Sequence, residues 1–240
     1  MCRLLAFTSL ERKSFSSVVG ESFPAFLALS TEHKDGWGIA YDGEILKDLD
    51  PAKDSELLSH SSSQRLSNGA LLHLRQASKG ISVNIDNNHP FTHGSTTFMH
   101  NGTIRPITVA EQFISPQYQS LVTGTTDSER FFYAMLSQID ELGLIEGVRK
   151  TVNLLRNLAD YTAMNIMVQT PDYLIAVCEF NPENQSEWSS PDHYELRFTA
   201  RGNDILVGST GWSNSDWQQL KNHSMLVVDR ATLDFSVSDL

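Results

Sequence analysis

The chain has 240 residues, of which 40% are hydrophobic and 20% charged, with 14 glycines and 8 prolines. This composition is typical of a globular protein and excludes a disordered chain, a collagen or a coiled coil as a description of the whole molecule. The 18 Lys and Arg against 29 Asp and Glu give a net charge of -11 (18 minus 29), which disfavours binding to the phosphate backbone of nucleic acid. Two cysteines, Cys2 and Cys178, cannot form a secreted disulfide framework and fit a reducing compartment.

No part of the sequence favours export or membrane insertion. The apolar run Leu4–Phe7 is shorter than the roughly 7–15 residues of a signal peptide's hydrophobic region. No later run approaches the roughly 18 apolar residues of a membrane helix. We therefore expect a cytoplasmic protein with no membrane partner.

The first third of the chain predicts strands and one longer helix. Residues 2–8 form a short apolar run that predicts a buried strand, and residues 16–31 predict a helix that carries Pro24. Two strand-like runs, 37–41 and 44–49, flank Asp42-Gly43, which is a hairpin turn signal. The Ser-rich segment 54–68 predicts a weak helix or a loop.

The middle of the chain predicts helices, and the end predicts strands again. Strand-like runs occur at 71–77 and 96–99. A Thr126-x-x-Glu129 capping box then predicts the start of a helix with the apolar residues 131, 132 and 134–136, and a second strong helix follows over 143–160. The remaining predicted strands are 164–169, 173–180, 195–201, 204–208 and 224–229, with a polar surface loop over 181–192. This order favours an α+β layered fold in one domain, 1–240, over a βαβ repeat.

Cys2 combines a thiol with the amino end of the chain. Removal of the initiator methionine, which is usual before a small residue, would leave Cys2 with a free α-amine. That amine has a reference pKa of about 7.7–8.0 and could serve as the base that makes the thiolate. The alternative is a small buried residue at the start of a strand. Cys178 lies in an apolar run and is predicted to be a core residue.

Asn101 and Gly102 are candidates for an oxyanion hole. A thiolate that attacks an amide creates a negative oxygen, which a side-chain amide and a backbone N–H can stabilise. The alternative is a turn, because Asn-Gly is a favoured pair in type I′ turns.

Three further residues could hold an α-amino acid. Arg75, near the end of a predicted strand, could bind a carboxylate in a bidentate fork, and Ser78 could add a hydroxyl contact. Asp127 could accept hydrogen bonds from an ammonium group. The alternatives are a surface arginine on a sheet edge and an acidic residue that favours the start of a helix.

These motifs together resemble class II glutamine amidotransferases. The resemblance rests on the segments Met1-Cys2-Arg3-Leu4-Leu5-Ala6, His33-Lys34-Asp35-Gly36-Trp37-Gly38, His73-Leu74-Arg75, His100-Asn101-Gly102 and Thr126-Asp127-Ser128-Glu129, in that order. The start Met-Cys-Arg is similar to the stand-alone branch that includes the γ-glutamyl hydrolase of ergothioneine synthesis, rather than to the glutaminase domains fused to synthases.

The resemblance implies a four-layer αββα sandwich of the N-terminal-nucleophile hydrolases. It implies Cys2 as the nucleophile with its α-amine as the base, and Asn101 with the Gly102 N–H as the oxyanion hole. Arg75 would bind the substrate α-carboxylate and Asp127 its ammonium, with Ser78 nearby. The fused glutaminases carry other residues at the positions of Arg3, Glu32, Gln76 and Ser78-Lys79, so a γ-glutamyl amide or peptide is as good a candidate substrate as glutamine.

The function that we expect is hydrolysis of a γ-glutamyl amide through a thioester. No nucleotide-binding motif occurs, so no cofactor is expected, and transfer of ammonia to an acceptor would need a partner chain. One alternative is a catalytically silent glutamine-binding or regulatory subunit of a partner enzyme. Another is a metal site at His89, His93 and His100, which Pro90 and Gly94 disfavour because they would interrupt a helix; we expect no metal.

Overall fold

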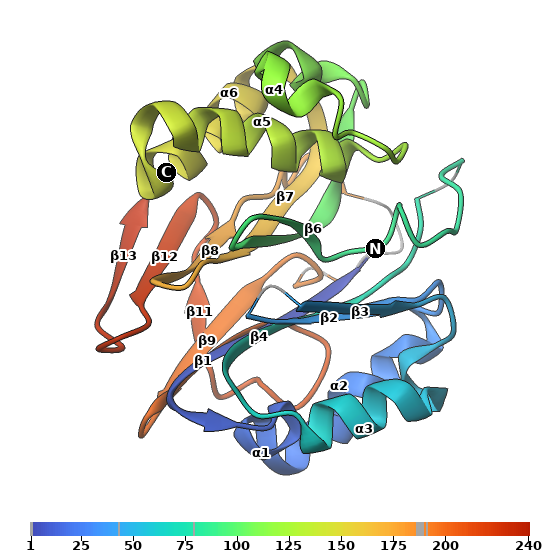
Figure 1. The fold of residues 1–240 in the computed structure, drawn as a ribbon, viewed down its shortest axis with the longest axis vertical. Coiled ribbons are helices and arrows are strands. Elements are labelled where there is room, and N and C mark those ends of the chain that lie inside the picture. Colours follow the sequence, from blue (N-terminus) through green and yellow to red (C-terminus); the bar gives the residue numbers. More distant parts are fainter. Residues whose placement is uncertain (1, 43, 79, 186–189, 191) are drawn as a thin grey trace.

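The computed structural model describes residues 2–42, 44–78, 80–185, 190 and 192–240. Two antiparallel sheets stack face to face, and helices cover the outer face of each (Figure 1). The structure therefore has the αββα layers implied by the motifs of the sequence.

Seven described strands form the first sheet. In spatial order they are β11 (Gln218–Leu220), β9 (Leu196–Arg201), β10 (Asp204–Ser209), β1 (Arg3–Lys13), β4 (Ser67–Leu74), β2 (Trp37–Tyr41) and β3 (Glu44–Asp48). The second sheet has six described strands, in the order β13 (Phe235–Asp239), β12 (Ser224–Asp229), β8 (Tyr173–Cys178), β7 (Asp160–Gln169), β6 (Thr96–Arg105) and β5 (Phe91–His93).

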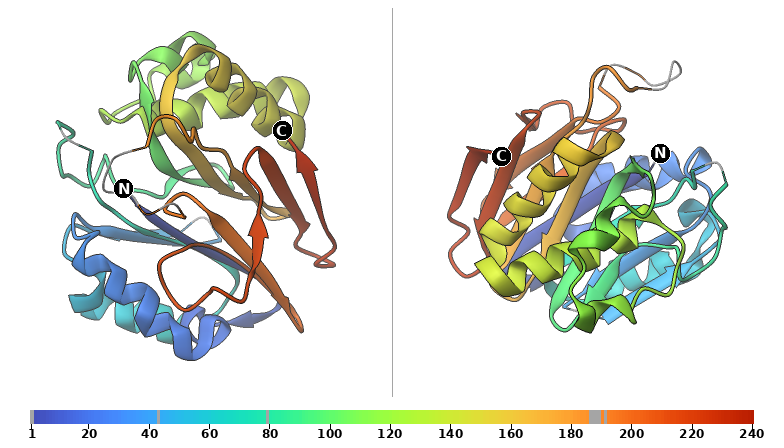
Figure 2. Two further views of the ribbon diagram at one scale, coloured as in Figure 1. Left: turned by 180° about the vertical axis from the view of Figure 1, so that it is seen from behind. Right: turned by 90° about the horizontal axis from the view of Figure 1, so that it is seen from above.

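Each outer layer comes from one stretch of the chain. The first sheet is covered by α1 (Phe15–Val19), α2 (Phe23–Ala28) and α3 (Glu56–Gln64), with short 3₁₀ turns at Gly20–Ser22, Leu29–Thr31 and Ala52–Asp54. The second sheet is covered by α4 (Pro116–Gln119), α5 (Asp127–Leu142) and α6 (Leu144–Leu158), after a 3₁₀ turn at Val109–Phe113 (Figure 2). None of the described helices is long and apolar enough to cross a membrane.

Alternation along β1 shows how the layers are held together. Leu5 and Phe7 pack toward α1 and α2, whereas Leu4 and Ala6 belong to the apolar cluster between the two sheets. Successive side chains of a strand point to opposite faces, so a strand buried on both sides has a continuous apolar run. Cys178 lies fully buried in the cluster between the sheets, as predicted.

The predicted helix over 16–31 is wrong in one respect, because the chain forms two short helices there. Gly20 ends α1 with a positive φ of 75°, a conformation that glycine adopts at low cost. Pro24 lies in the first turn of α2, where its missing N–H does no harm. The uncertain segment 54–68 contains a true helix, α3, which Ser55 caps by accepting from Leu58 N at 3.2 Å.

Most of the predicted strands are confirmed within a few residues, and so is the helix over 143–160. The confirmed strands are 2–8, 37–41, 44–49, 164–169, 173–180, 195–201, 204–208 and 224–229. Strand β4 begins earlier than predicted and ends at Leu74. The three strands that were not predicted are short or exposed: β5, β11 and β13. Gly43 of the predicted hairpin turn, and residues 186–189 and 191 of the predicted loop, lie outside the described residues; the described residues 181–185 contain no helix and no extended strand.

The largest correction concerns Asn101 and Gly102. Both lie inside β6, which continues to Arg105, so the alternative of a type I′ turn is wrong. Asn101 pairs with Asn165 and Gly102 with Met164 on β7, and the register shifts between Gly102 and Ile104. Such a bulge bends the strand and changes the direction in which the following residues point.

Gly38→Ala tests the packing between β2 and the segment before β5. A Cβ at Gly38 would lie 2.0 Å from His89 O and 2.9 Å from Pro90 Cδ, so backbone would have to move. We expect a loss of about 2–3 kcal/mol in the free energy of unfolding, measured by urea denaturation.

Gly94→Ala is the matched control for this variant. Gly94 has a φ of 58° and no atom within 4 Å of the added Cβ, so only the strain of a left-handed alanine remains, about 1 kcal/mol. Equal losses in the two variants would contradict the proposed contact.

Candidate active site

Four structural elements bring the predicted residues to one end of the sandwich. Cys2 directly precedes β1, and Arg75 directly follows β4, which pairs with β1 so that Arg3 lies opposite Leu74. Gly102 lies on β6 of the second sheet, and Asp127 is the first residue of α5. In Figure 1 the amino end emerges between the two layers on the same side as the segment that links β4 to β5.

One small cavity, named here the Cys2 cavity, connects these residues. Its described lining residues are Cys2, Arg75, Gln76, Ala77, Ser78, Ile81, Asn87, His89, His100, Gly102, Thr126, Asp127 and Ser128. Five of the six predicted site residues therefore line one space. Asn101 does not line it; its side chain is fully buried on β6 beside the cavity wall.

The thiol of Cys2 is half-buried and lies 3.6 Å from Gln76 O, to which it donates a hydrogen bond. Burial raises the pKa of this thiol, and the positive charges of the amino terminus, Arg75 and Arg3 oppose that change. A thiol in this setting needs a base before it can attack a carbonyl. Met1 lies outside the described residues, so the free α-amine of Cys2 stays a prediction.

Arg75 presents a guanidinium that is only partly used by the protein. Its Nη2 donates to Ser82 O at 3.0 Å, while its Nη1 is buried without a hydrogen-bond partner among the described residues. Burial lowers the pKa of Arg75 from its ordinary value, but a guanidinium stays charged. A buried cation with an unused donor favours an anionic ligand, because leaving such a donor unpaired is costly.

Asp35 and Gly36 hold the backbone around Arg75 in place. Arg75 N donates to Gly36 O at 2.8 Å, and Asp35 N donates to Arg75 O at 3.0 Å. The Asp35 carboxylate then accepts from Ala77 N at 2.8 Å. The Asp-Gly-Trp-Gly segment thus acts here through packing and backbone support.

Asp127 combines a structural role with a place in the cavity wall. Its Oδ2 accepts from Ile104 N at 2.6 Å and its Oδ1 from Ser128 N at 3.0 Å, so it ties the start of α5 to β6. Thr126 caps the helix by accepting from Glu129 N at 3.2 Å, as the predicted capping box requires. Each carboxylate oxygen has two lone pairs, which leaves Asp127 able to accept from an ammonium as well.

Ser78 faces the second sheet. Its Oγ lies 3.3 Å from Thr103 Oγ1 on β6, and either hydroxyl could be the donor. The contact links the segment after β4 to the strand that carries Asn101 and Gly102, so both walls of the Cys2 cavity are connected.

Asn101 and Gly102, the two residues predicted for an oxyanion hole, lie in crowded surroundings on β6. Both polar atoms of the Asn101 side chain are buried without a partner among the described residues, which is rare for an amide and favours a ligand contact. A Cβ at Gly102 would lie 1.8 Å from Ala163 O, so no other residue fits the strand there.

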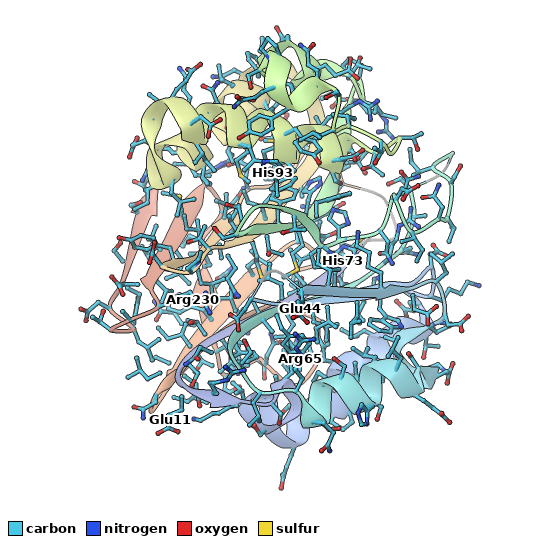
Figure 3. All side chains as sticks on the ribbon, viewed as in Figure 1. Glu11, Glu44, Arg65, His73, His93 and Arg230 are labelled. Atoms are coloured by element: carbon cyan, nitrogen blue, oxygen red, sulfur yellow. The ribbon has the colours of Figure 1, made fainter. Side chains whose placement is uncertain are left out.

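Three buried histidines, His73, His89 and His100, lie in one cluster that the sequence did not predict. His73 and His89 stack with ring centroids 4.3 Å apart, and His100 lies 6.4 Å from His89. His100 Nδ1 lies 2.9 Å from Ser128 Oγ and its Nε2 lies 3.2 Å from Ala163 O. Figure 3 shows His73 on the side of the molecule where the chain begins, with His93 well apart.

Among the described residues, no set of three or more His, Cys, Asp or Glu is placed to hold a metal ion.

A larger cavity of about 790 Å³ lies elsewhere, around Arg230, Gln169 and Asp42. Arg230 is labelled on the opposite side of Figure 3 from His73. None of the six predicted site residues lines this cavity, so its size does not make it the site of the expected chemistry.

Comparison with known sequences decides the family. The sequence profile described as "Glutamine amidotransferases class-II" matches residues 1–233. The chain belongs to this family. The resemblance noted from the short motifs is confirmed at this level, whereas the ergothioneine branch stays a prediction.

Two curated relatives match this class II glutamine amidotransferase over nearly its whole length. An uncharacterized protein of Methanocaldococcus jannaschii is 26% identical over 98% of this chain and 71% of its own length. The "Probable glutamine amidotransferase DUG3" of Saccharomyces cerevisiae is 23% identical over 97% of this chain and 83% of its own length.

Solved structures confirm the fold. A glutamine aminotransferase class-II domain protein from Silicibacter pomeroyi is similar over 100% of this chain, with a TM-score of 0.69 and 18% identity. The glutamine phosphoribosylpyrophosphate amidotransferase of B. subtilis is similar over 99% of this chain but 49% of its own, with a TM-score of 0.66 and 16% identity.

The buried histidines predict an acid-sensitive fold. Burial lowers the pKa of His73 and His89 well below the ordinary 6.5, with the charge of Arg75 and the neighbouring ring adding to the effect, and burial also lowers the pKa of His100. The unfolded chain therefore takes up protons below pH 6.5 that the folded chain does not. We expect the free energy of unfolding to fall as pH decreases below 6.5, by up to about 1.4 kcal/mol per pH unit for each histidine.

Urea denaturation between pH 7.5 and 5 would measure this slope. His89→Phe removes one of these groups and should reduce the slope by about one proton's contribution. His60→Gln is the matched control, because His60 is exposed on α3 and its ring is hydrated in both states. An unchanged slope in His89→Phe would contradict the assignment.

Proposed function

We propose that this class II glutamine amidotransferase hydrolyses the γ-amide bond of glutamine or of a γ-glutamyl compound, with Cys2 as the nucleophile. The observation that carries the proposal is the Cys2 cavity itself, in which a thiol, a buried arginine with an unused donor and a carboxylate line one space. The name of the Saccharomyces cerevisiae relative supports the reaction class, and the arrangement of charges supports an α-amino acid as the part that is bound.

Recognition of the glutamyl group would use opposite charges. The Arg75 guanidinium would bind the α-carboxylate, and the Asp127 carboxylate would accept from the α-ammonium, with Ser78 available for a further hydrogen bond. Charge-assisted bonds of this kind are about twice as strong as neutral ones. The other end of the glutamyl side chain would then point toward Cys2.

The chemistry would proceed in two steps. The Cys2 α-amine, freed by removal of Met1, takes the thiol proton, and the thiolate sulfur bonds to the γ-carbon. The carbon–nitrogen bond breaks, and the nitrogen leaves as ammonia or an amine after taking the proton from the α-ammonium. Water then attacks the thioester, the carbon–sulfur bond breaks, and glutamate and the thiol are restored.

Stabilisation of the oxyanion would come from β6. The Asn101 side-chain amide and the Gly102 N–H are the proposed donors. Fixed donors lower the barrier because they need no reorganisation as the negative charge develops on the oxygen. The buried, unpartnered amide of Asn101 supports this role, since such a group costs stability unless a ligand uses it.

We also propose that 1–240 is one glutamine amidotransferase domain. Transfer of the released ammonia to an acceptor would require a partner enzyme. No feature of the described residues favours the catalytically silent alternative, which predicts glutamine binding without turnover. Assignment to the ergothioneine-type branch is part of the same proposal and depends on the substrate found.

Labelling of Cys2 tests the nucleophile directly. A glutamine-like electrophile should alkylate Cys2, and Cys2→Ala should abolish both labelling and glutamate release. Cys178→Ala is the matched control: burial raises the pKa of that thiol to about 12, so it should neither react nor be needed. Intact mass should show loss of Met1, and active protein that retains Met1 would contradict the α-amine as base.

Asn101→Ala tests the oxyanion hole. We expect kcat to fall by about 10²–10³, with little loss of stability because the Asn101 side chain makes no hydrogen bond within the described structure. Asn203→Ala, at an exposed turn between β9 and β10, is the control. An unchanged kcat in Asn101→Ala would remove this side chain from the mechanism.

A further inference from the structure

A second cavity adjoins the Cys2 cavity, and none of the six predicted site residues lines it. It has a volume of about 540 Å³, and its described lining residues are Arg3, Thr31, Glu32, His33, Lys34, Gln76, Ser190 and His193. We call it the Arg3 cavity. Gln76 lines both cavities, and its carbonyl accepts the hydrogen bond from the Cys2 thiol, so the two spaces meet beside the nucleophile.

Arg3 is the second buried arginine next to Cys2. Its Nη1 lies 3.4 Å from Cys2 O and 3.2 Å from His193 O, and its Nη2 lies 3.2 Å from His193 Nδ1. Its Nε is buried without a partner among the described residues. Arg3 thus resembles Arg75: each is a buried cation with one donor that the described protein does not use.

His193 adds a second unused donor. A guanidinium can only donate, so the Nδ1 that faces Arg3 must accept, and the ring proton then lies on Nε2. That Nε2 is also buried without a partner among the described residues. Burial, followed by the charge of Arg3, lowers the pKa of His193 to about 4, so the ring is neutral near pH 7.

The charge of the Arg3 cavity favours an anion. Arg3 and Lys34 are positive, and Glu32 is the acidic residue in the described lining. Glu32 and Asp192 act on Arg3 only at longer range, because no carboxylate of the described residues lies within 4.0 Å of its guanidinium. Arg3 and His193, each with one buried N–H that has no partner among the described residues, both line this cavity, and its net positive charge favours a carboxylate.

We infer that the Arg3 cavity binds a carboxylate carried by the amine that leaves when the γ-glutamyl bond breaks. The inference rests on the proposed function: Arg75 and Asp127 hold the glutamyl group on one side of Cys2, and the leaving amine lies on the other. The substrate class would be a γ-glutamyl amino acid or short peptide, with one carboxylate for each buried arginine. Because the same space receives any amine that attacks the thioester, it would also bind an acceptor amino acid.

Two matched pairs of substrates test this subsite. The first pair is γ-L-glutamylglycine and γ-L-glutamylglycinamide, which differ only in the terminal charge. The second is γ-L-glutamyl-alanylglycine and its terminal amide, which place that charge farther from the scissile bond. The measured quantity is the ratio of kcat/KM for acid over amide, from the release of glutamate, in the wild type and three variants.

We expect the wild type to prefer the acid by about 10-fold or more in at least one pair. Arg3→Gln should remove most of that preference. Lys34→Gln, at the exposed rim, should reduce it by about twofold to fivefold. Lys150→Gln makes the same charge change on the exposed side of α6 and should leave both activity and ratio unchanged.

Each other outcome has a distinct meaning. Equal kcat/KM for acid and amide in both pairs, or a preference that neither Arg3→Gln nor Lys34→Gln reduces, overturns the subsite while the proposed function stands. Failure to hydrolyse any of the four compounds or glutamine overturns the proposed function and the subsite with it. If Arg3→Gln does not fold, the wild-type ratio and Lys34→Gln still decide.

Discussion

The pairing of β1 with β4 is the constraint on which the rest of the site depends. Leu74 lies opposite Arg3, so the residue that precedes β1 and the residue that follows β4 come together at one end of the first sheet. The thiol of Cys2 and the guanidinium of Arg75 meet there because backbone hydrogen bonds fix the register. A slip of one residue would turn the side chains of one strand to the opposite face relative to the other, and the two groups would no longer share one space. The second sheet then brings β6 and the start of α5 against this end, which adds Gly102 and Asp127.

The site concentrates polar groups that the described protein leaves unsatisfied. Arg75 Nη1, Arg3 Nε and the Asn101 amide are all buried without partners among the described residues. Each such group costs stability, and the cost must be offset by the apolar layers on either side. Their position around one thiol supports the proposal that ligand atoms complete the hydrogen bonds. The stacked rings of His73 and His89, the second of which lines the Cys2 cavity, stay neutral because burial disfavours their charged forms.

Much of the architecture could be predicted from local patterns. Alternating or continuous apolar runs predicted most of the long strands, and helical spacing predicted α6. The pattern was least informative where an element is short or exposed, as in β5 and β13, because few apolar residues are then needed. The apolar pattern predicted one helix over 16–31, and this was wrong. Gly20 ends the first of two short helices and Pro24 lies in the first turn of the second, although the apolar spacing continues through both. The pattern was ambiguous at Asn101-Gly102, because a pair that favours a turn also suits a strand that approaches its neighbour closely.

The sequence alone determined the family and the order of its motifs: a thiol at position 2, then Arg75, then Asn101-Gly102, then Asp127 at a helix start. Those features are local, and residue type with short spacing is enough to recognise them. Only the tertiary structure decided which of them share a cavity, that Asn101 lies beside the wall, and that Arg3 meets His193, 190 residues away. Such contacts depend on which strands pair and how two sheets stack. The period of side chains along one strand determines a face, but it does not determine the neighbour on that face.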